Sequence, residues 1–448
     1  MMKKSEQILL AFRNLSRQKR RSFMLAFAIA FGFFVVTAID GLATGAVENL
    51  ETQITQMLGG NVIVQGIERL PSEKEGKKGK IINLTRDENF VRDIFTKSGI
   101  KYKYYSQRAM VSGSLIFNGK KVTSNVYGCS FKDEKPLVES FRVDEGSLDK
   151  LYDESSIVIS RKTADSLKIK VGETLRYSTE TINGQNTFGE FTVIAITRDS
   201  GLLASYGAYA NMSAVNKMIE APENSYYMFS VTLVNKDDQN KAAQLIEDEI
   251  RKAGVPITNR LAAYAKNPKT PIAALNRQIK DADWKGTMYS VASLEDAVPQ
   301  LNQVMSIVNM VTTIILLVIL LIVMVGISNT YRMVLYERIR EIGTMRALGM
   351  TGKDTGTIFT LEALILAFLG ATAGFIVAIF GMSIFGLFTF QNESISFFLH
   401  NGHFTYHLTF GSYVLKFILM IVLTVLAVRG TAKQASNMSP ATALRTIK

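Results

Sequence analysis

Four apolar runs, each long enough to cross a bilayer as a helix, constrain this chain more than any other feature. A hydrocarbon core about 30 Å thick requires roughly 20 helical residues. We predict transmembrane helices at residues 23–45, 304–329, 358–390 and 408–428. The first run follows basic residues, as a secretory signal does, but its length and the amphipathic stretch after it favour a retained anchor. Because four is an even number, both chain ends should lie on one side of the membrane.

The distribution of charge predicts which side that is. The chain has 51 Lys and Arg against 39 Asp and Glu, a net charge of +12. Residues 1–22, 330–357 and 429–448 hold seven, five and four basic residues and only four acidic ones in total, so they account for the whole excess. Basic loops and tails next to spans remain in the cytoplasm. We therefore place these three segments there, and the charge argues for contact with lipid headgroups over nucleic acid.

The region between the first two spans, residues 46–303, is long enough for folded domains outside the cytoplasm. Alternating strand patterns flank Asn118-Gly119, a dipeptide typical of hairpin turns. We predict an α+β lobe from residues 46–135 and 223–292 with an inserted β-rich lobe at 136–222. Helical stretches next to the spans, including residues 293–303, predict a stalk. The expected fold is thus four transmembrane helices plus an extracytoplasmic α+β domain of two lobes.

The cytoplasmic loop 330–357 contains the string YRMVLYERIREIGTMRALGMTGK, which predicts a helix ended by Gly349 and Gly352. Leu335, Ile339, Ile342 and Leu348 can share one helical face. On composition alone this helix is equally compatible with a headgroup-binding interfacial helix. The basic segment 1–22 predicts another amphipathic helix, residues 391–407 a short outer loop, and residues 429–448 a tail.

Three strings carry a family resemblance: LLAFRNLSRQKRRSFM before the first span, ERIREIGTMRALGM in the loop, and the terminal SPATALR. Their order around four spans resembles the MacB/FtsX-like (type VII) permeases of ABC transporters. The outer string IVISRKTADSLKIKVGETLRY, followed by FTVIAITRDSGL, is similar to the MacB-like periplasmic core domain, particularly in the lipoprotein-releasing (LolC/LolE-like) branch.

The resemblance implies an inner-membrane permease that works as a dimer of identical or related chains with two cytoplasmic ATPase subunits. Its periplasmic domain would act on lipoproteins and hand them to a carrier or adaptor. Peptide, toxin or drug export with an outer-membrane partner, or activation of a cell-wall hydrolase, are the alternatives. The helix after the second span corresponds to a coupling helix that contacts the ATPase. The positions implied as contacts are Glu337, Arg338, Glu341, Ile342, Gly343, Arg346, Ala347 and Gly349.

The sequence contains no G-x-x-x-x-G-K-[ST] motif, which would hold nucleotide phosphates. We therefore expect no catalytic residue and no cofactor on this chain, with ATP and Mg²⁺ bound by a separate ATPase. This departs from relatives that fuse the two parts.

Several other residues have open interpretations. His400, His403 and His407 could form a metal site, although interfacial packing is the simpler prediction, and no metal is expected. Glu362 lies in an apolar run and could serve a proton relay or simply complement the helix dipole. Gly370 and Gly374 have the spacing of a close helix contact, either within the chain or across a dimer.

Overall fold

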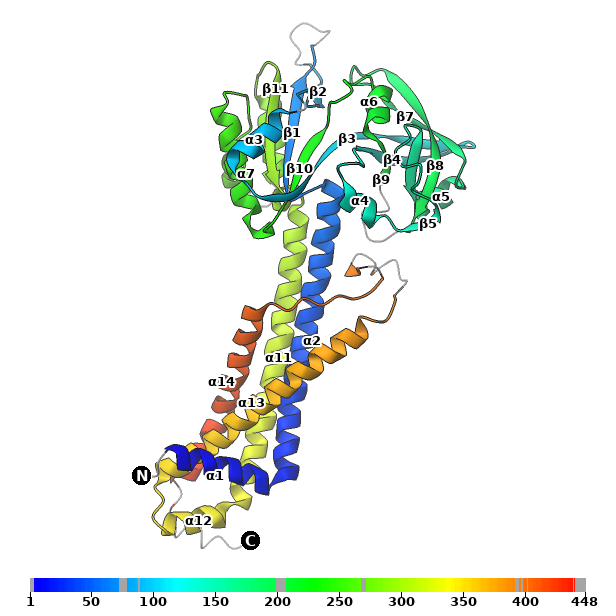
Figure 1. The fold of residues 1–448 in the computed structure, drawn as a ribbon. Coiled ribbons are helices and arrows are strands. Elements are labelled where there is room, and N and C mark those ends of the chain that lie inside the picture. Colours follow the sequence, from blue (N-terminus) through cyan, green and yellow to red (C-terminus); the bar gives the residue numbers. More distant parts are fainter. Residues whose placement is uncertain are drawn as a thin grey trace. The chain divides into compact units, whose positions relative to one another are not determined.

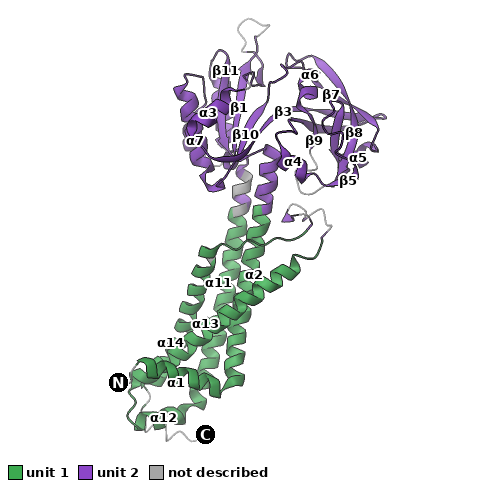
Figure 2. Ribbon diagram, in the orientation of Figure 1, with its two compact units in different colours: residues 1–48, 306–389, 403–448 green, residues 49–305, 390–402 purple. Residues whose placement is uncertain are grey.

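The computed structural model describes residues 4–71, 79–87, 89–198, 207–266, 271–390, 395, 398–400, 402–437 and 439. It divides into two compact units, which are coloured separately in Figure 2. Unit 1 comprises residues 1–48, 306–389 and 403–448, and unit 2 comprises residues 49–305 and 390–402. The terminal part of the predicted tail and most of the predicted outer loop before residue 398 lie outside the described residues.

Unit 1 is helical (Figure 1). Four of its helices are long and apolar enough to cross a membrane: α2, α11, α13 and α14. Their bounds are Lys19–Leu58, Pro299–Glu337, Gly352–Phe385 and Phe410–Asn437. The shorter helices are α1 (Lys4–Arg17) and α12 (Ile339–Ala347).

The third long helix ends earlier than residue 390, the limit that hydropathy predicts. Helix α13 stops at Phe385, and Phe385 stacks on Phe404 with ring centroids 5.3 Å apart. The residues just beyond, Leu387 and Phe388, are apolar but exposed. Hydropathy cannot locate this helix end, because apolar side chains continue past the last helical turn.

Two glycines bring α13 against α2. A Cβ atom on Gly374 would lie 2.3 Å from the Ala30 carbonyl oxygen, and one on Gly370 would lie 2.8 Å from the Ala26 carbonyl oxygen. Both distances are too short for a real side chain. The contact therefore lies within the chain, and it lets Ile29 pack into the buried core that α2, α11, α13 and α14 share.

Unit 2 is built on one mixed sheet whose main path runs β11-β1-β10-β3-β4-β9-β6-β8-β5, with β2 beside β1 and β7 beside β3 and β8. The strand bounds are β1 Val62–Arg69, β2 Ile81–Asn83, β3 Tyr102–Phe117, β4 Lys120–Cys129, β5 Val143–Gly146, β6 Ser156–Ser160, β7 Thr174–Glu180, β8 Asn186–Thr197, β9 Gly207–Asn211, β10 Met228–Leu233 and β11 Thr287–Ser293. The helices are α3 Phe90–Ser98, α4 Lys135–Ser140, α5 Arg161–Leu167, α6 Met212–Met218, α7 Gln239–Lys252, α8 Arg260–Lys266, α9 Pro271–Asp281 and α10 Leu294–Ala297, with a 3-10 turn, η2, at Lys236–Asp238.

The hairpin predicted at Asn118-Gly119 is confirmed. Strands β3 and β4 pair antiparallel from Phe117↔Lys120 onward, and both turn residues have positive φ, 45° and 76°. This is the backbone of a type I′ turn, which matches the twist of the strands. The turn fixes the register of the two long strands at the centre of the sheet.

Unit 2 has two main hydrophobic cores, but they do not divide at residue 136. One core lies between α3, α7 and strands β1, β10 and β11. The other contains Leu115 of β3 and Val126 of β4 together with residues of the predicted inserted lobe, such as Ile157 and Val193. Because β3 is 16 residues long, it takes part in both cores. The far halves of β3 and β4 therefore pack with the lobe that we expected to be separate.

The predicted stalk at residues 293–303 is not one continuous helix, which corrects our expectation. Helix α10 ends at Ala297, Val298 leaves helical geometry (φ −130°, ψ 69°), and α11 begins at Pro299. A proline disfavours helical geometry in the residue before it and is well accommodated in the first turn of a helix. The break at Val298 follows from Pro299. Hydrophobic periodicity alone does not predict this break, because it takes no account of the backbone restriction that a proline imposes.

The end of α2 is bound tightly to the sheet within unit 2. Arg108 of β3 donates hydrogen bonds to the carbonyl oxygens of Gln56 and Met57, in the last turn of α2. The same buried guanidinium donates to Glu134 at 2.6 and 2.8 Å. Arg108 thus satisfies carbonyl groups that a helix C-terminus leaves without partners.

Candidate functional site

Helix α12 is the element at which the loop prediction is tested. Arg338 leaves helical geometry (φ −95°, ψ 6°), so the long α11 stops at Glu337 and α12 starts in a new direction at Ile339. Gly349, with φ 101°, ends the turn after α12. Thr351 then caps α13 in a reciprocal capping box with Asp354. The loop is therefore a short separate helix with a defined start and end.

A buried ion pair holds the bend before α12. Arg338 donates through Nη1 to both carboxylate oxygens of Glu362, at 3.0 and 3.1 Å. The Asn14 amide of α1 donates to the same carboxylate at 2.8 Å. The side chains of Arg338 and Glu362 are only 9% and 4% exposed. Three segments, α1, the α11–α12 bend and α13, consequently meet at one carboxylate.

Further polar contacts connect the surroundings of α12 to neighbouring helices of unit 1. Gln7 of α1 donates to Asp354 at 2.8 Å, and Arg346 donates to the Ser436 carbonyl of α14 at 2.8 Å. Glu337 forms an ion pair with Arg21. This pair connects the end of α11 to the start of α2. The result is an α12 held from several sides.

The structure separates the eight predicted contact positions into two groups. Arg338, Ile342 and Gly343 are buried within the chain, while Arg346 is partly buried against Ser436. Exposed positions are Glu337, Glu341, Ala347 and Gly349. The side chain of Glu341 is 56% exposed and keeps only a 3.9 Å contact with Arg338.

The predicted contact positions omit Arg340 and Thr344, which are exposed on the same helix as Glu341. Leu348, which we expected to share an apolar face with Ile342, is instead 89% exposed immediately after the helix. We define the α12 patch as Arg340, Glu341, Thr344, Ala347 and Leu348. The partnership of Arg338 with Glu362 had one sequence signal, an acidic residue inside an apolar run. The role of Asn14 had none.

The predicted metal and relay candidates have ordinary partners. The His407 ring contacts Glu48 at 2.8 Å and the His403 ring contacts the Phe388 carbonyl at 3.1 Å. Across the described ranges, three or more His, Cys, Asp or Glu side chains nowhere cluster as a metal site would require. The buried Glu362 carboxylate accepts hydrogen bonds from Arg338 and Asn14. These contacts favour a structural role for Glu362 over a proton relay.

Comparison with known families decides the broader class. Residues 22–249, just over half of the chain, match the MacB-like periplasmic core domain, and residues 313–440 match the FtsX-like permease C-terminal family. The chain belongs to the MacB/FtsX permease family. It is therefore an ABC transporter permease, which confirms the class inferred from the three strings, and an ABC permease works with an ATPase.

Two relatives of this MacB/FtsX permease are uncharacterised ABC transporter permeases of Methanocaldococcus jannaschii. One is 21% identical over 437 residues, covering 96% of each chain. The other is 29% identical over 113 residues, which is 25% of this chain and 31% of the relative.

Two solved structures of outer domains resemble part of the chain. The periplasmic region of MacB from Actinobacillus actinomycetemcomitans is 18% identical, with 44% of this chain and 86% of that chain covered and a TM-score of 0.28. The extracellular domain of YknZ from Gram-positive bacteria is 14% identical, with 43% and 95% covered and a TM-score of 0.29.

Proposed function

We propose that this permease binds a separate cytoplasmic ATPase subunit through the α12 patch and passes ATP-driven motion to its extracytoplasmic domain. The observation that carries the proposal is the pairing of an exposed patch with a buried anchor on one nine-residue helix. Glu341 and Leu348 are free to contact a partner, while Arg338 and Ile342 fasten the other side of α12 to unit 1. A helix anchored in this way can pass a displacement of its partner on to the rest of unit 1.

The chemistry of the α12 patch suits a protein partner. It combines a guanidinium, a carboxylate and a hydroxyl group with an almost fully exposed leucine. Charged groups at such a surface set orientation and partner choice, and a leucine that enters a pocket adds affinity through burial. A lipid-facing interfacial helix would instead carry a broad apolar face, and the apolar face of α12 is the one already buried within unit 1.

Nucleotide chemistry belongs on the partner in this proposal. The sequence lacks a phosphate-binding loop, so ATP and Mg²⁺ would be held by the ATPase, two copies of which would serve a dimer of permeases. The charge distribution supports an arrangement with α12 and both termini in the cytoplasm of an inner-membrane protein. The domain formed by unit 2 would then be periplasmic.

For the substrate, we propose a lipoprotein extracted from the outer leaflet. The support is the similarity of residues 157–177 and 191–202 to the lipoprotein-releasing branch, together with four candidate spans, few for a lined channel. The alternatives are export of peptides, toxins or drugs and activation of a cell-wall hydrolase. The co-purification experiment described next distinguishes them from lipoprotein release.

Co-purification from the native membrane tests both levels of the proposal. The tagged full-length permease should retain an ATPase with a phosphate-binding loop, together with a lipoprotein or its periplasmic carrier. Recovery of a cell-wall hydrolase, or of an outer-membrane export partner, would replace the substrate assignment. Hydrolysis of ATP by the purified permease alone would overturn the proposal that a separate subunit binds and hydrolyses ATP.

A further inference from the structure

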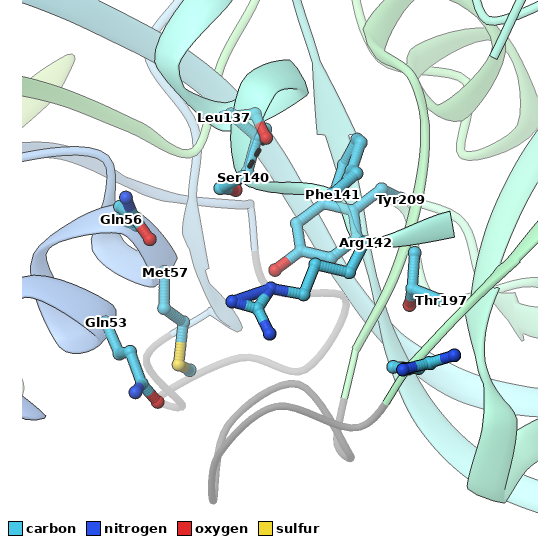
Figure 3. Close-up of a pocket in the computed structure, with 10 residues that line it drawn as sticks. Gln53, Gln56, Met57, Leu137, Ser140, Phe141, Arg142, Thr197 and Tyr209 are labelled. Atoms are coloured by element: carbon cyan, nitrogen blue, oxygen red, sulfur yellow. Dashed lines mark hydrogen bonds between the residues drawn. The ribbon is translucent and has the colours of Figure 1, made fainter. Parts of the chain in front are cut away.

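A small pocket in unit 2 lies outside every part of the site described so far. Its volume is about 90 Å³, and it forms where the last turns of α2 meet the segment after α4 and the ends of β8 and β9 (Figure 3). The lining residues used below are Gln53, Gln56, Arg142, Thr197, Arg198 and Tyr209.

Two arginines, Arg142 and Arg198, line this pocket, and only Arg198 has a carboxylate partner. The backbone N–H of Arg198 donates to the Arg142 carbonyl at 2.9 Å, which places the two residues side by side. Arg198 contacts Asp144 at 3.0 Å, but Asp144 also binds Arg161. The guanidinium of Arg142 makes no hydrogen bond or ion pair with any described residue.

The positive charge of Arg142 is not neutralised by any described carboxylate. Partial burial, and then the positive charge of Arg198, lower the pKa of Arg142 from its usual value. A guanidinium remains charged even so, because its ordinary pKa lies far above neutrality. Arg198 and Arg161 share Asp144, and Arg161 also pairs with Glu145, so the neighbouring Arg142 is left without a described carboxylate and could be completed by an anion.

Neutral hydrogen-bonding groups complete the wall. In Figure 3 the Arg142 guanidinium extends between Met57 on the α2 side and Tyr209 on the β9 side. The Tyr209 hydroxyl has no hydrogen-bond partner among the described residues. Burial raises the pKa of Tyr209, so the hydroxyl remains a donor at neutral pH. Gln56 and Gln53 line the opposite side, and the Gln53 amide already donates to the Leu399 carbonyl at 3.3 Å.

We propose that this pocket binds the phosphate group of a ligand, held by Arg142 and Arg198 with Tyr209 and the α2 glutamines around it. The donors come from separate elements and approach from different sides. A tetrahedral oxyanion presents oxygens in several directions and can use them together, whereas a planar carboxylate presents two. The volume admits the charged group and excludes a whole lipid, so any organic part of the ligand would remain outside.

The pocket also touches the junction that holds α2 to the sheet. Gln56 and Met57 line it, and their carbonyl groups are the ones that Arg108 binds. A ligand there would connect the last turn of α2 with β8 and β9 through its own oxygens. This inference goes beyond the proposed function, because it requires neither an ATPase nor a particular transported substrate.

The test uses the full-length permease in detergent and isothermal titration calorimetry at constant ionic strength. Inorganic phosphate, glycerol 3-phosphate and acetate are the probes. Saturable binding of either phosphate compound supports the site, and a preference between them distinguishes free phosphate from a phospholipid headgroup. Arg142→Gln should weaken binding by about tenfold or more, the usual effect of losing a charge-assisted hydrogen bond.

The matched control is Arg176→Gln, which removes another arginine of the same unit that is exposed and paired with Glu190. It should bind phosphate like the unaltered protein. Arg198→Gln provides a second variant should Arg142→Gln fail to fold. Equal binding in the control and in both pocket variants, equally tight binding of acetate, or no saturable binding of either phosphate compound would overturn the proposal.

Discussion

The contact between Arg338 and Glu362 is a buried ion pair in unit 1. Both groups are buried, so each depends on the other to compensate for lost hydration. Breaking such a pair from one side leaves an uncompensated charge, whereas replacing both partners by apolar residues is often neutral. The pair therefore matters for positioning more than for net stability.

Arg338→Met should lower the free energy of unfolding by about 3–5 kcal/mol, because it leaves Glu362 buried without its cation. The double variant Arg338→Met with Glu362→Leu should recover most of that loss. Thermal unfolding of the detergent-solubilised protein measures both. Equal destabilisation in the single and double variants would show that the charges do not interact as described.

At Glu341 the expected effect is on activity and not on folding. The side chain is half exposed and has no short contact, so Glu341→Arg should leave thermal stability within about 0.5 kcal/mol. ATP-driven transport by the reconstituted complex should fall severalfold, because the reversed charge opposes its partner in the ATPase. Glu223→Arg, the same change at an exposed position of unit 2, is the control and should transport normally.

Cys129, the single cysteine, offers a direct measure of unit 2 integrity. It is fully buried, and burial raises the pKa of its thiol, so the reactive thiolate is scarce at neutral and mildly alkaline pH. Maleimide should label the folded protein slowly at pH 8 and rapidly in denaturant. Arg108→Met should accelerate labelling by loosening the neighbouring junction. Rapid labelling of the native, unaltered protein would contradict the burial of this strand.

Among the helices, the contact of α13 with α2 depends on the absence of a side chain. Gly374→Ala would bring a Cβ atom within 2.3 Å of the Ala30 carbonyl oxygen and force the helices apart. We expect a loss of about 1–3 kcal/mol, typical of overpacking. Gly326→Ala in α11 is the control, since no atom lies within 4 Å of that position, and it should be neutral or slightly stabilising. Thermal unfolding distinguishes the two, and equal effects would contradict the close contact.

Local sequence signals identified many of these elements but not all of their limits. The turn at Asn118-Gly119 follows from residues adjacent in the chain, and it agrees with the structure. The break at Val298 depends on one proline within an otherwise helical pattern. The sharing of β3 between two cores depends on strands distant in sequence, which no local pattern reports.

The same distinction applies to the candidate site. The α12 sequence indicated a helix with charged and apolar residues, and the structure contains that helix. It could not indicate which residues face inward, because burial of Ile342 and Gly343 depends on helices elsewhere in unit 1. Asn14 is more than 300 residues from Glu362 in the chain, and its hydrogen bond arises only from the packing of α1.

For the molecule as a whole, the family membership and the charge distribution support one account. The net charge of +12 arises entirely from segments adjoining the spans, including the one that contains α12. Helices α2 and α11 each include residues of both units without a described interruption. Both observations support the proposal that the chain passes force along its helices and that a partner which binds ATP supplies the energy.

Cross-linking from Ala347 tests this account most directly. Ala347 is exposed in the α12 patch, and the native Cys129 is buried, so Ala347→Cys introduces a selectively reactive thiol. A benzophenone maleimide attached there in native membranes should cross-link to a polypeptide that mass spectrometry identifies as an ABC ATPase. Labelling of the same thiol from outside intact cells by a membrane-impermeant maleimide would contradict the account, since α12 would then face away from any cytoplasmic motor.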